Sequence, residues 1–143
     1  MRALRASEHF ASHIAKGKQA IKGEHRALIL EDKKSKVSAT IDFEAAVEGI
    51  HADRKRWDYF LELESNPAAM HGVEIHKFDR SSLHSKKVDT LAILADLCAP
   101  AVMEIRSWTV IVKGNLPRQD LVARFSADTK IKVRRSLSLN ELK

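Results

Sequence analysis

The chain has a single cysteine, Cys98, among its 143 residues. One cysteine excludes a disulfide within the chain, and apolar neighbours indicate a small buried side chain in a reducing compartment. No apolar run is long enough to cross a bilayer. Residues 1–9 also lack the apolar core of a signal peptide. We therefore expect a cytoplasmic protein that does not bind a membrane.

Several common catalytic signatures are also missing. The five glycines form no phosphate-binding loop, and no serine or cysteine stands in a triad signature. Histidines are frequent, but the spacing of His51, His71, His76 and His84 matches no zinc motif. No internal repeat or linker interrupts the chain. These absences leave a single domain without a P-loop or a standard hydrolase triad.

Positive charge is what the sequence has in excess. The net charge is +6 and the pI is about 9.6, within an ordinary composition of 44% hydrophobic residues. A basic domain is attracted to polyanions, so nucleic acid is an expected partner. Two groups of basic residues can be either solvated faces or phosphate contacts. They are Lys18, Lys22 and Arg26 near the start, and Lys130, Lys132, Arg134 and Arg135 near the end.

The hydrophobic pattern predicts an α/β fold, with a single mixed β-sheet and flanking helices. Proline and glycine positions separate the elements. The expected elements, in order, are a helix over 7–26, strands over 36–43, 57–64 and 73–78, a helix from about 83 to Pro100, a strand over 107–113, a short helix over 119–125 and a late strand over 129–139. An exposed edge strand of such a sheet can also support a homodimer.

The polar residues of the second and third expected strands are the main candidates for a site. Side chains alternate faces along a strand, so Asp58 shares a face with Phe60, and Glu74 shares a face with His76. If residues 65–67 form a hairpin loop, Asp58, Glu74 and His76 converge on one side of the sheet. Two carboxylates beside a basic residue suit a hard divalent cation.

This order of elements and residues resembles the PD-(D/E)XK nuclease superfamily, which has the restriction-endonuclease-like fold. The family core runs α-β-β-β-α-β, with an aspartate on the second strand and Glu-x-Lys on the third. By this resemblance Asp58 takes the aspartate position and Glu74 the glutamate position. His76 stands at the lysine position, and Trp57 stands where the named motif has proline. The resemblance covers about residues 7–113.

Other family features map onto nearby residues. Glu24 matches an acidic residue that some members carry in the first helix. Lys86 or Lys87 matches a catalytic lysine that has migrated to the second helix. The patterns at 56–59 and 73–76 are also similar to those of small bacterial proteins. The resemblance thus implies catalytic roles for His76, Lys86 and Lys87.

The resemblance implies a metal-dependent phosphodiesterase or nuclease that uses Mg²⁺ or Mn²⁺ held by Asp58 and Glu74. His76 then acts as a general base, or as a ligand that favours Mn²⁺, or marks a degenerate active site. In the simpler interpretation, Asp58 pairs with Arg56 or Lys55, and Glu74 with His76 is a polar pair on an exposed face. The alternative function is a non-catalytic basic α/β module that binds nucleic acid or a protein partner.

Overall fold

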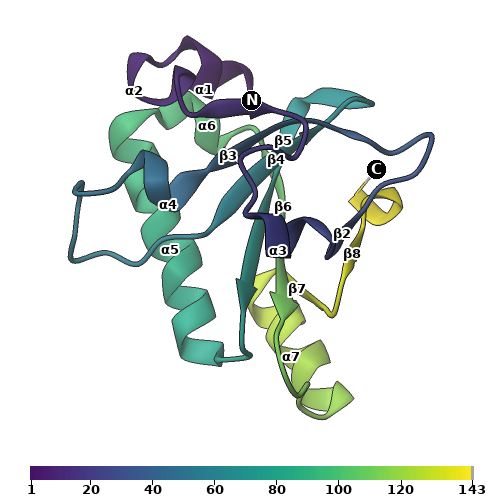
Figure 1. The fold of residues 1–143 in the computed structure, drawn as a ribbon. Coiled ribbons are helices and arrows are strands. Elements are labelled where there is room, and N and C mark those ends of the chain that lie inside the picture. Colours follow the sequence, from purple (N-terminus) through teal and green to yellow (C-terminus); the bar gives the residue numbers. More distant parts are fainter. Residues whose placement is uncertain (143) are drawn as a thin grey trace.

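The computed structural model describes residues 1–142 and has an α/β fold with a mixed six-stranded sheet (Figure 1). The helices are α1 (Arg2–Ala6), α2 (Glu8–Ala11), α3 (Gly23–Arg26), α4 (Phe43–Ala46), α5 (Arg80–Leu97), α6 (Ala99–Val102), α7 (Gln119–Thr129) and the 3₁₀ helix η1 (Leu139–Leu142). The strands are β1 (Ile14–Lys16), β2 (Ile29–Leu30), β3 (Val37–Asp42), β4 (Tyr59–Leu63), β5 (Asn66–His76), β6 (Ile105–Val112), β7 (Ile131–Arg134) and β8 (Leu137–Ser138).

The main sheet has the strand order β1-β3-β4-β5-β6-β7. The pairs from β1 to β5 are antiparallel, whereas β5 with β6 and β6 with β7 are parallel. Parallel neighbours need a crossover, and α5 and α7 supply the two crossovers. A second sheet pairs β2 with β8 in parallel. The sheet is therefore mixed, as the sequence predicted.

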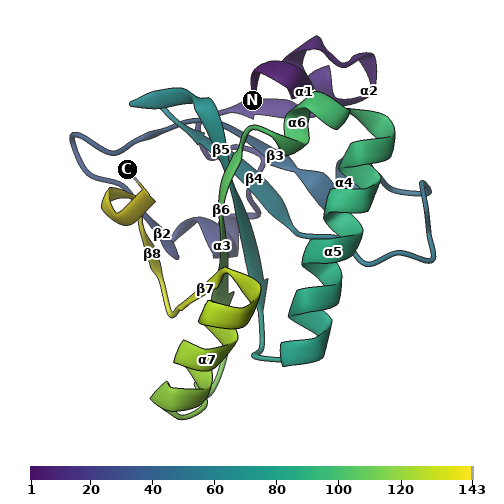
Figure 2. The same ribbon diagram turned by 180° about the vertical axis from the view of Figure 1, so that it is seen from behind.

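Each face of the main sheet carries its own apolar core. One cluster includes Phe60, Trp108 and Val110 and packs against buried side chains of α5 and α7. The other cluster includes Leu61 and Ile75 and packs against the C-terminal segment and the β2 region. Opposite views in Figures 1 and 2 show α5 and α7 on one side and α3, β2 and β8 on the other. The sheet is thus the central layer of three.

The predicted helix over residues 7–26 is wrong. Helix α2 ends at Ala11, and the next residues form β1, which pairs antiparallel with β3. Gly17 then takes a left-handed φ of 56°, a conformation that ends the strand and that glycine adopts at low cost. The Thr40 hydroxyl fixes this turn by donating to the Gly17 carbonyl and accepting from the Ala20 N–H. Tertiary pairing with β3 overrode the weak helical spacing.

The other expected elements are confirmed with shifted ends. Strands β3 and β4 fall inside their predicted ranges, whereas β6 begins two residues before its predicted start, at Ile105, and β5 begins much earlier than predicted, at Asn66. Helix α5 begins at Arg80 because the Asp79 carboxylate accepts the Ser82 N–H and so caps the first turn. The late strand is divided into β7 and β8. Within residues 1–142, no helix has the length and apolar character required to span a membrane.

Candidate functional site

Asp58 and Glu74 lie side by side where β4 and β5 pair. The register pairs Tyr59 with Val73, so Asp58 and Glu74 stand opposite each other. The Asp58 N–H donates to Glu74 Oε1 over 2.9 Å. The Ile75 N–H donates to Asp58 Oδ2 over 3.0 Å. The predicted convergence of these two carboxylates is confirmed.

Lys86 reaches the same point from helix α5. Its ammonium forms an ion pair with Glu74 Oε2. The Glu74 side chain is fully buried, and that of Lys86 is only 18% exposed. Helix α5 is held in register against this end of β4 because the Thr90 hydroxyl accepts the Trp57 N–H over 2.8 Å. A strand pair and a crossover helix therefore bring three charged groups together.

Burial dominates the electrostatics of Glu74. Loss of solvent, and after it the adjacent negative charge of Asp58, raise the pKa of this carboxyl to about 8. The hydrogen bond and the charge of Lys86 oppose this rise. The ionised form of the Glu74 carboxyl therefore needs a nearby positive charge to stabilise it. A shifted pKa of this size is typical of functional carboxyls.

His76 and Lys87, the other expected catalytic residues, make different contacts. The half-buried His76 bonds through Nδ1 to the Lys77 carbonyl at 2.7 Å. Lys87 donates to the Thr129 carbonyl over 2.6 Å, and its ammonium lies 5.6 Å from the centre of the Trp108 ring. Of the three expected catalytic residues, Lys86 is the one that contacts the carboxylate pair.

The simpler interpretation of Asp58 is also tested by these contacts. Arg56 donates to the carbonyls of Val47, Ile50 and His51, at 2.6 to 2.8 Å, so its guanidinium stabilises the preceding loop. The Lys55 N–H donates to the Asp89 carboxylate on α5. The expected surface pair between Asp58 and Arg56 or Lys55 is therefore wrong, as no ion pair within residues 1–142 joins them. Glu74 pairs with Lys86 and not with His76.

The basic residues near the start of the chain that were expected to contact phosphate have different surroundings. Lys18 forms an ion pair with Glu31 at 3.4 Å, and Arg26 donates to the carbonyls of Ile21 and Gln19. Both therefore stabilise their own loop. Lys22 is exposed and lines the pocket described below.

The basic residues near the end of the chain lie on other surfaces. Lys130 is exposed in a left-handed conformation that ends α7. Lys132 is half-buried on β7. Arg134 forms an ion pair with Glu141 at 3.1 Å. Arg135 donates to the Gly114 carbonyl. None of these four lines the pocket beside the carboxylate pair.

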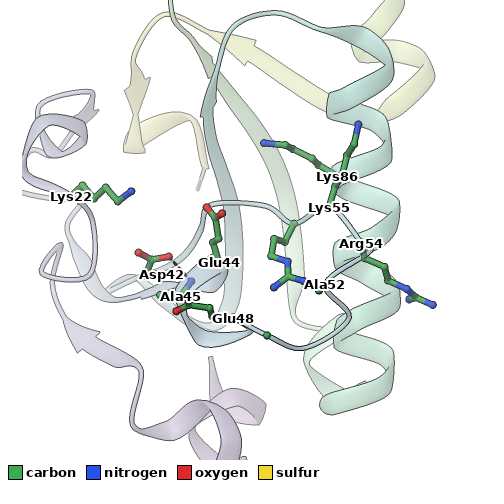
Figure 3. Close-up of a pocket in the computed structure, with 11 residues that line it drawn as sticks. Lys22, Asp42, Glu44, Ala45, Glu48, Ala52, Arg54, Lys55 and Lys86 are labelled. Carbon is green, nitrogen blue, oxygen red and sulfur yellow. Dashed lines mark hydrogen bonds between the residues drawn. The ribbon is translucent and has the colours of Figure 1, made fainter.

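An open pocket of about 630 Å³ adjoins the carboxylate pair. Lys86 belongs to its wall and also contacts Glu74, so this lysine links the pocket to the pair, although neither Asp58 nor Glu74 lines the pocket. The Phe43 N–H donates to the Asp58 carbonyl, which fixes α4 beside the same strand end. Figure 3 shows acidic residues around α4, with Lys55 and Lys86 on the α5 side. The lining residues are Lys22, Asp42, Glu44, Ala45, Glu48, Gly49, Ala52, Arg54, Lys55, Arg56 and Lys86.

Sequence reasoning missed Arg54 and Lys55 as residues that line the pocket. They belong to the basic run over 54–56, which Trp57 separates from Asp58, and this run was the one signal in the sequence. The loop that carries them is not regular, so no periodicity showed which way its side chains face. Contacts between this loop and α5 decide that they line the pocket.

The donor set suits a hard cation that keeps most of its water. Residues 1–142 contain no group of three or more His, Cys, Asp or Glu side chains placed to hold a metal ion. A structural zinc site is thus disfavoured, because it needs four protein ligands. Mg²⁺ can be bound by one or two carboxylates with several retained waters, as Asp58 and Glu74 would allow. Burial, and after it the adjacent charge of Asp58, raise the pKa of Glu74, so a bound cation would favour the ionised form of this carboxyl.

Asp58, Glu74 and Lys86 thus form a compact charged cluster on one face of the sheet, where β4, β5 and α5 meet. The cluster can hold a hard cation and contact an anion in the adjoining pocket. Comparison of the chain with models of protein families, with curated proteins and with solved structures gave no match.

Proposed function

We propose that this protein is a metal-dependent phosphodiesterase that acts on nucleic acid, with Asp58, Glu74 and Lys86 at its active site. One observation carries the proposal. Asp58, directly before β4, lies opposite Glu74 on β5, and Glu74 pairs with the Lys86 ammonium of a crossover helix beside an open pocket that is lined by further cations. This combination of groups is what hydrolysis of a phosphodiester requires.

Asp58 and Glu74 would hold Mg²⁺ or Mn²⁺ between their carboxylates. When bound, the metal ion would lower the pKa of a coordinated water and neutralise charge on the phosphate. Lys86 has a second role. Its ammonium would turn from Glu74 toward the phosphate, where it stabilises developing negative charge. The Ile75 N–H keeps Asp58 oriented through the bond to Oδ2.

Charge and topology support the choice of substrate and family. The net charge of +6 favours a polyanion, and Lys22, Arg54 and Lys55 extend positive charge around the pocket. Three antiparallel strands followed by a helix and a parallel strand suit the PD-(D/E)XK core, in which Lys86 would replace the lysine that His76 displaces. The helix that opens that core corresponds here to the short helices α1 and α2.

A cleavage assay tests this function. Purified protein is incubated with supercoiled plasmid, linear single-stranded DNA and structured RNA in Mg²⁺, Mn²⁺ or EDTA. We expect metal-dependent cleavage, with a loss of at least about 100-fold in Asp58→Asn, Glu74→Gln and Lys86→Met, since each removes an electrostatic group from the transition state.

Two variants serve as matched controls. Lys87→Met removes the neighbouring lysine, and His76→Ala removes the histidine at the motif position, and both should keep most of the activity. Equal loss in Lys86→Met and Lys87→Met would contradict the assigned role of Lys86. Cleavage that persists in EDTA, or in Asp58→Asn, would refute the metal-dependent mechanism.

The second candidate is a non-catalytic module that binds nucleic acid through its basic surface. The direct pairing of Lys86 with Glu74 favours it, because this contact competes with a metal for the Glu74 carboxylate. In that case binding would weaken with salt, would not need a metal, and would persist in Asp58→Asn.

A further inference from the structure

The pocket beside Lys86 holds charges of both signs that do not neutralise each other. Glu44 and Glu48 lie around α4, Lys55 lies on the α5 side, and Lys22 lies across from it (Figure 3). No ion pair of residues 1–142 includes any of these four side chains. Unpaired acceptors and unpaired cations therefore face one open space.

A ligand that binds both the acidic side and the basic side of the pocket needs hydrogen-bond donors for the first and an anionic group for the second. The pocket volume of about 630 Å³ lies in the range of small-molecule sites, which is about 300–1,000 Å³. A nucleotide has both features, because its phosphate is an anion and its base carries N–H donors. The phosphate would lie at Lys55 and Lys86, close to Glu74. The base would extend toward Glu44 and Glu48.

The carboxylates on the acidic side of the pocket favour bases with a matching pattern of hydrogen-bond donors. An ionised carboxylate only accepts hydrogen bonds, and it does so best from two parallel donors. Guanine alone presents two adjacent donors, N1–H and N2–H, on its Watson–Crick edge. Adenine and cytosine place an acceptor nitrogen beside their amino group, and uracil flanks its single N–H with two carbonyls. A glutamate in this pocket therefore favours guanine.

We propose that this pocket binds a guanine nucleotide, with the phosphate at Lys55 and Lys86 and the base at Glu44 or Glu48. Because Lys86 also contacts Glu74, the bound guanosine would lie next to the phosphate that is cleaved. The Watson–Crick edge is free only in unpaired nucleotides, so the substrate would be single-stranded. The placement relative to cleavage rests on the proposed function, whereas the binding itself does not.

Binding of mononucleotides in EDTA tests this inference. GMP, AMP, CMP and UMP, each as the 5′-monophosphate, are titrated into the full chain at low salt by calorimetry. We expect GMP to bind at least about fivefold more tightly than the others, the lower bound for a good bidentate contact. Lys55→Met should weaken all four nucleotides by a similar factor, because it removes a phosphate contact.

Glutamate variants separate base selection from charge. Glu44→Gln and Glu48→Gln are both on exposed positions, and at least one of them should abolish the preference for GMP. Glu64→Gln, an equally exposed change at the β4–β5 turn, should preserve it. Equal affinity for the four nucleotides, no binding of any, or a preference for GMP that survives both pocket changes would overturn the inference.

The two proposals fail separately. Mononucleotide binding in EDTA involves neither metal nor cleavage, so its failure leaves the cleavage result unchanged. GMP-selective binding in a protein that cleaves nothing would retain the guanine site and remove the catalytic assignment.

Discussion

Two buried glutamates on neighbouring strands have pKa values that are shifted in opposite directions. Glu62 accepts hydrogen bonds from Nη1 and Nη2 of Arg5, from Ser38 and from the Met1 ammonium. These contacts outweigh burial and lower its pKa to about 2. Glu74 has one cation, Lys86, and a carboxylate neighbour, Asp58, so burial prevails and its pKa rises to about 8. The surrounding cations thus compensate Glu62 fully and Glu74 only in part, which makes Glu74 the stronger candidate for a functional carboxylate.

The largest stability effect is expected at Glu62. Glu62→Ala leaves the Arg5 guanidinium and the Met1 ammonium without their buried partner, which costs about 3–5 kcal/mol for a buried ion pair broken on one side. Urea denaturation measures the loss. Glu64→Ala, two residues along at an exposed position, should change the free energy of unfolding by less than about 0.5 kcal/mol. Equal effects of both changes would contradict the structural role of Glu62.

The two glutamates should give pH dependences of opposite sign. The pKa of Glu62 is lowered on folding, so its stabilisation is complete above pH about 4.5 and is lost as the pH falls toward about 2. The pKa of Glu74 is raised on folding, so its contribution is most favourable below about 4.5 and declines as the pH rises toward about 8.

Unfolding measured across this range separates the two groups. Between pH 5 and 8, the titration of Glu74 should lower the free energy of unfolding of the wild type by up to about 1.4 kcal/mol per pH unit. Glu74→Gln should flatten that slope and leave the acid limb unchanged. A slope that persists in Glu74→Gln would show that another group titrates there.

The charged pair of Glu74 and Lys86 should limit stability. The double change Glu74→Gln and Lys86→Met removes a desolvated ion pair together with its repulsion from Asp58, and we expect a gain of about 1 kcal/mol. Thermal unfolding at pH 7 measures it, with Lys87→Met as the matched lysine control. A loss of stability in the double variant would mean that the pair is structural, as Glu62 is.

A bound metal ion should also stabilise the folded chain. At a Mg²⁺ or Mn²⁺ concentration of ten times the dissociation constant, linkage adds about 1.4 kcal/mol to the free energy of unfolding. Asp58→Asn should lose this increment, whereas Glu62→Gln should keep it. An increment of equal size in Asp58→Asn would place the metal elsewhere.

The sequence by itself determined the α/β class, the strands β3, β4 and β6, and the shared face of Asp58 and Glu74. Alternation with a period of two sets which side chains share a face, and it is a local property of the chain. It also predicted that these two carboxylates would meet if their strands paired antiparallel. The tight hairpin alone does not set their register, because the register shifts between Leu61 and Leu63, and this irregularity places Asp58 opposite Glu74.

Tertiary structure decided the rest. Periodicity could not distinguish Lys86 from Lys87, because which lysine reaches Glu74 depends on the rotation of α5 against the sheet, fixed by contacts such as that of Thr90 with Trp57. It also could not exclude a helix over residues 7–26, where pairing of β1 with β3 prevailed. The pocket depends on a loop before Asp58 that has no period at all. The site owes its cation and its shape to contacts between residues that are distant in sequence. No local pattern in the chain shows such contacts.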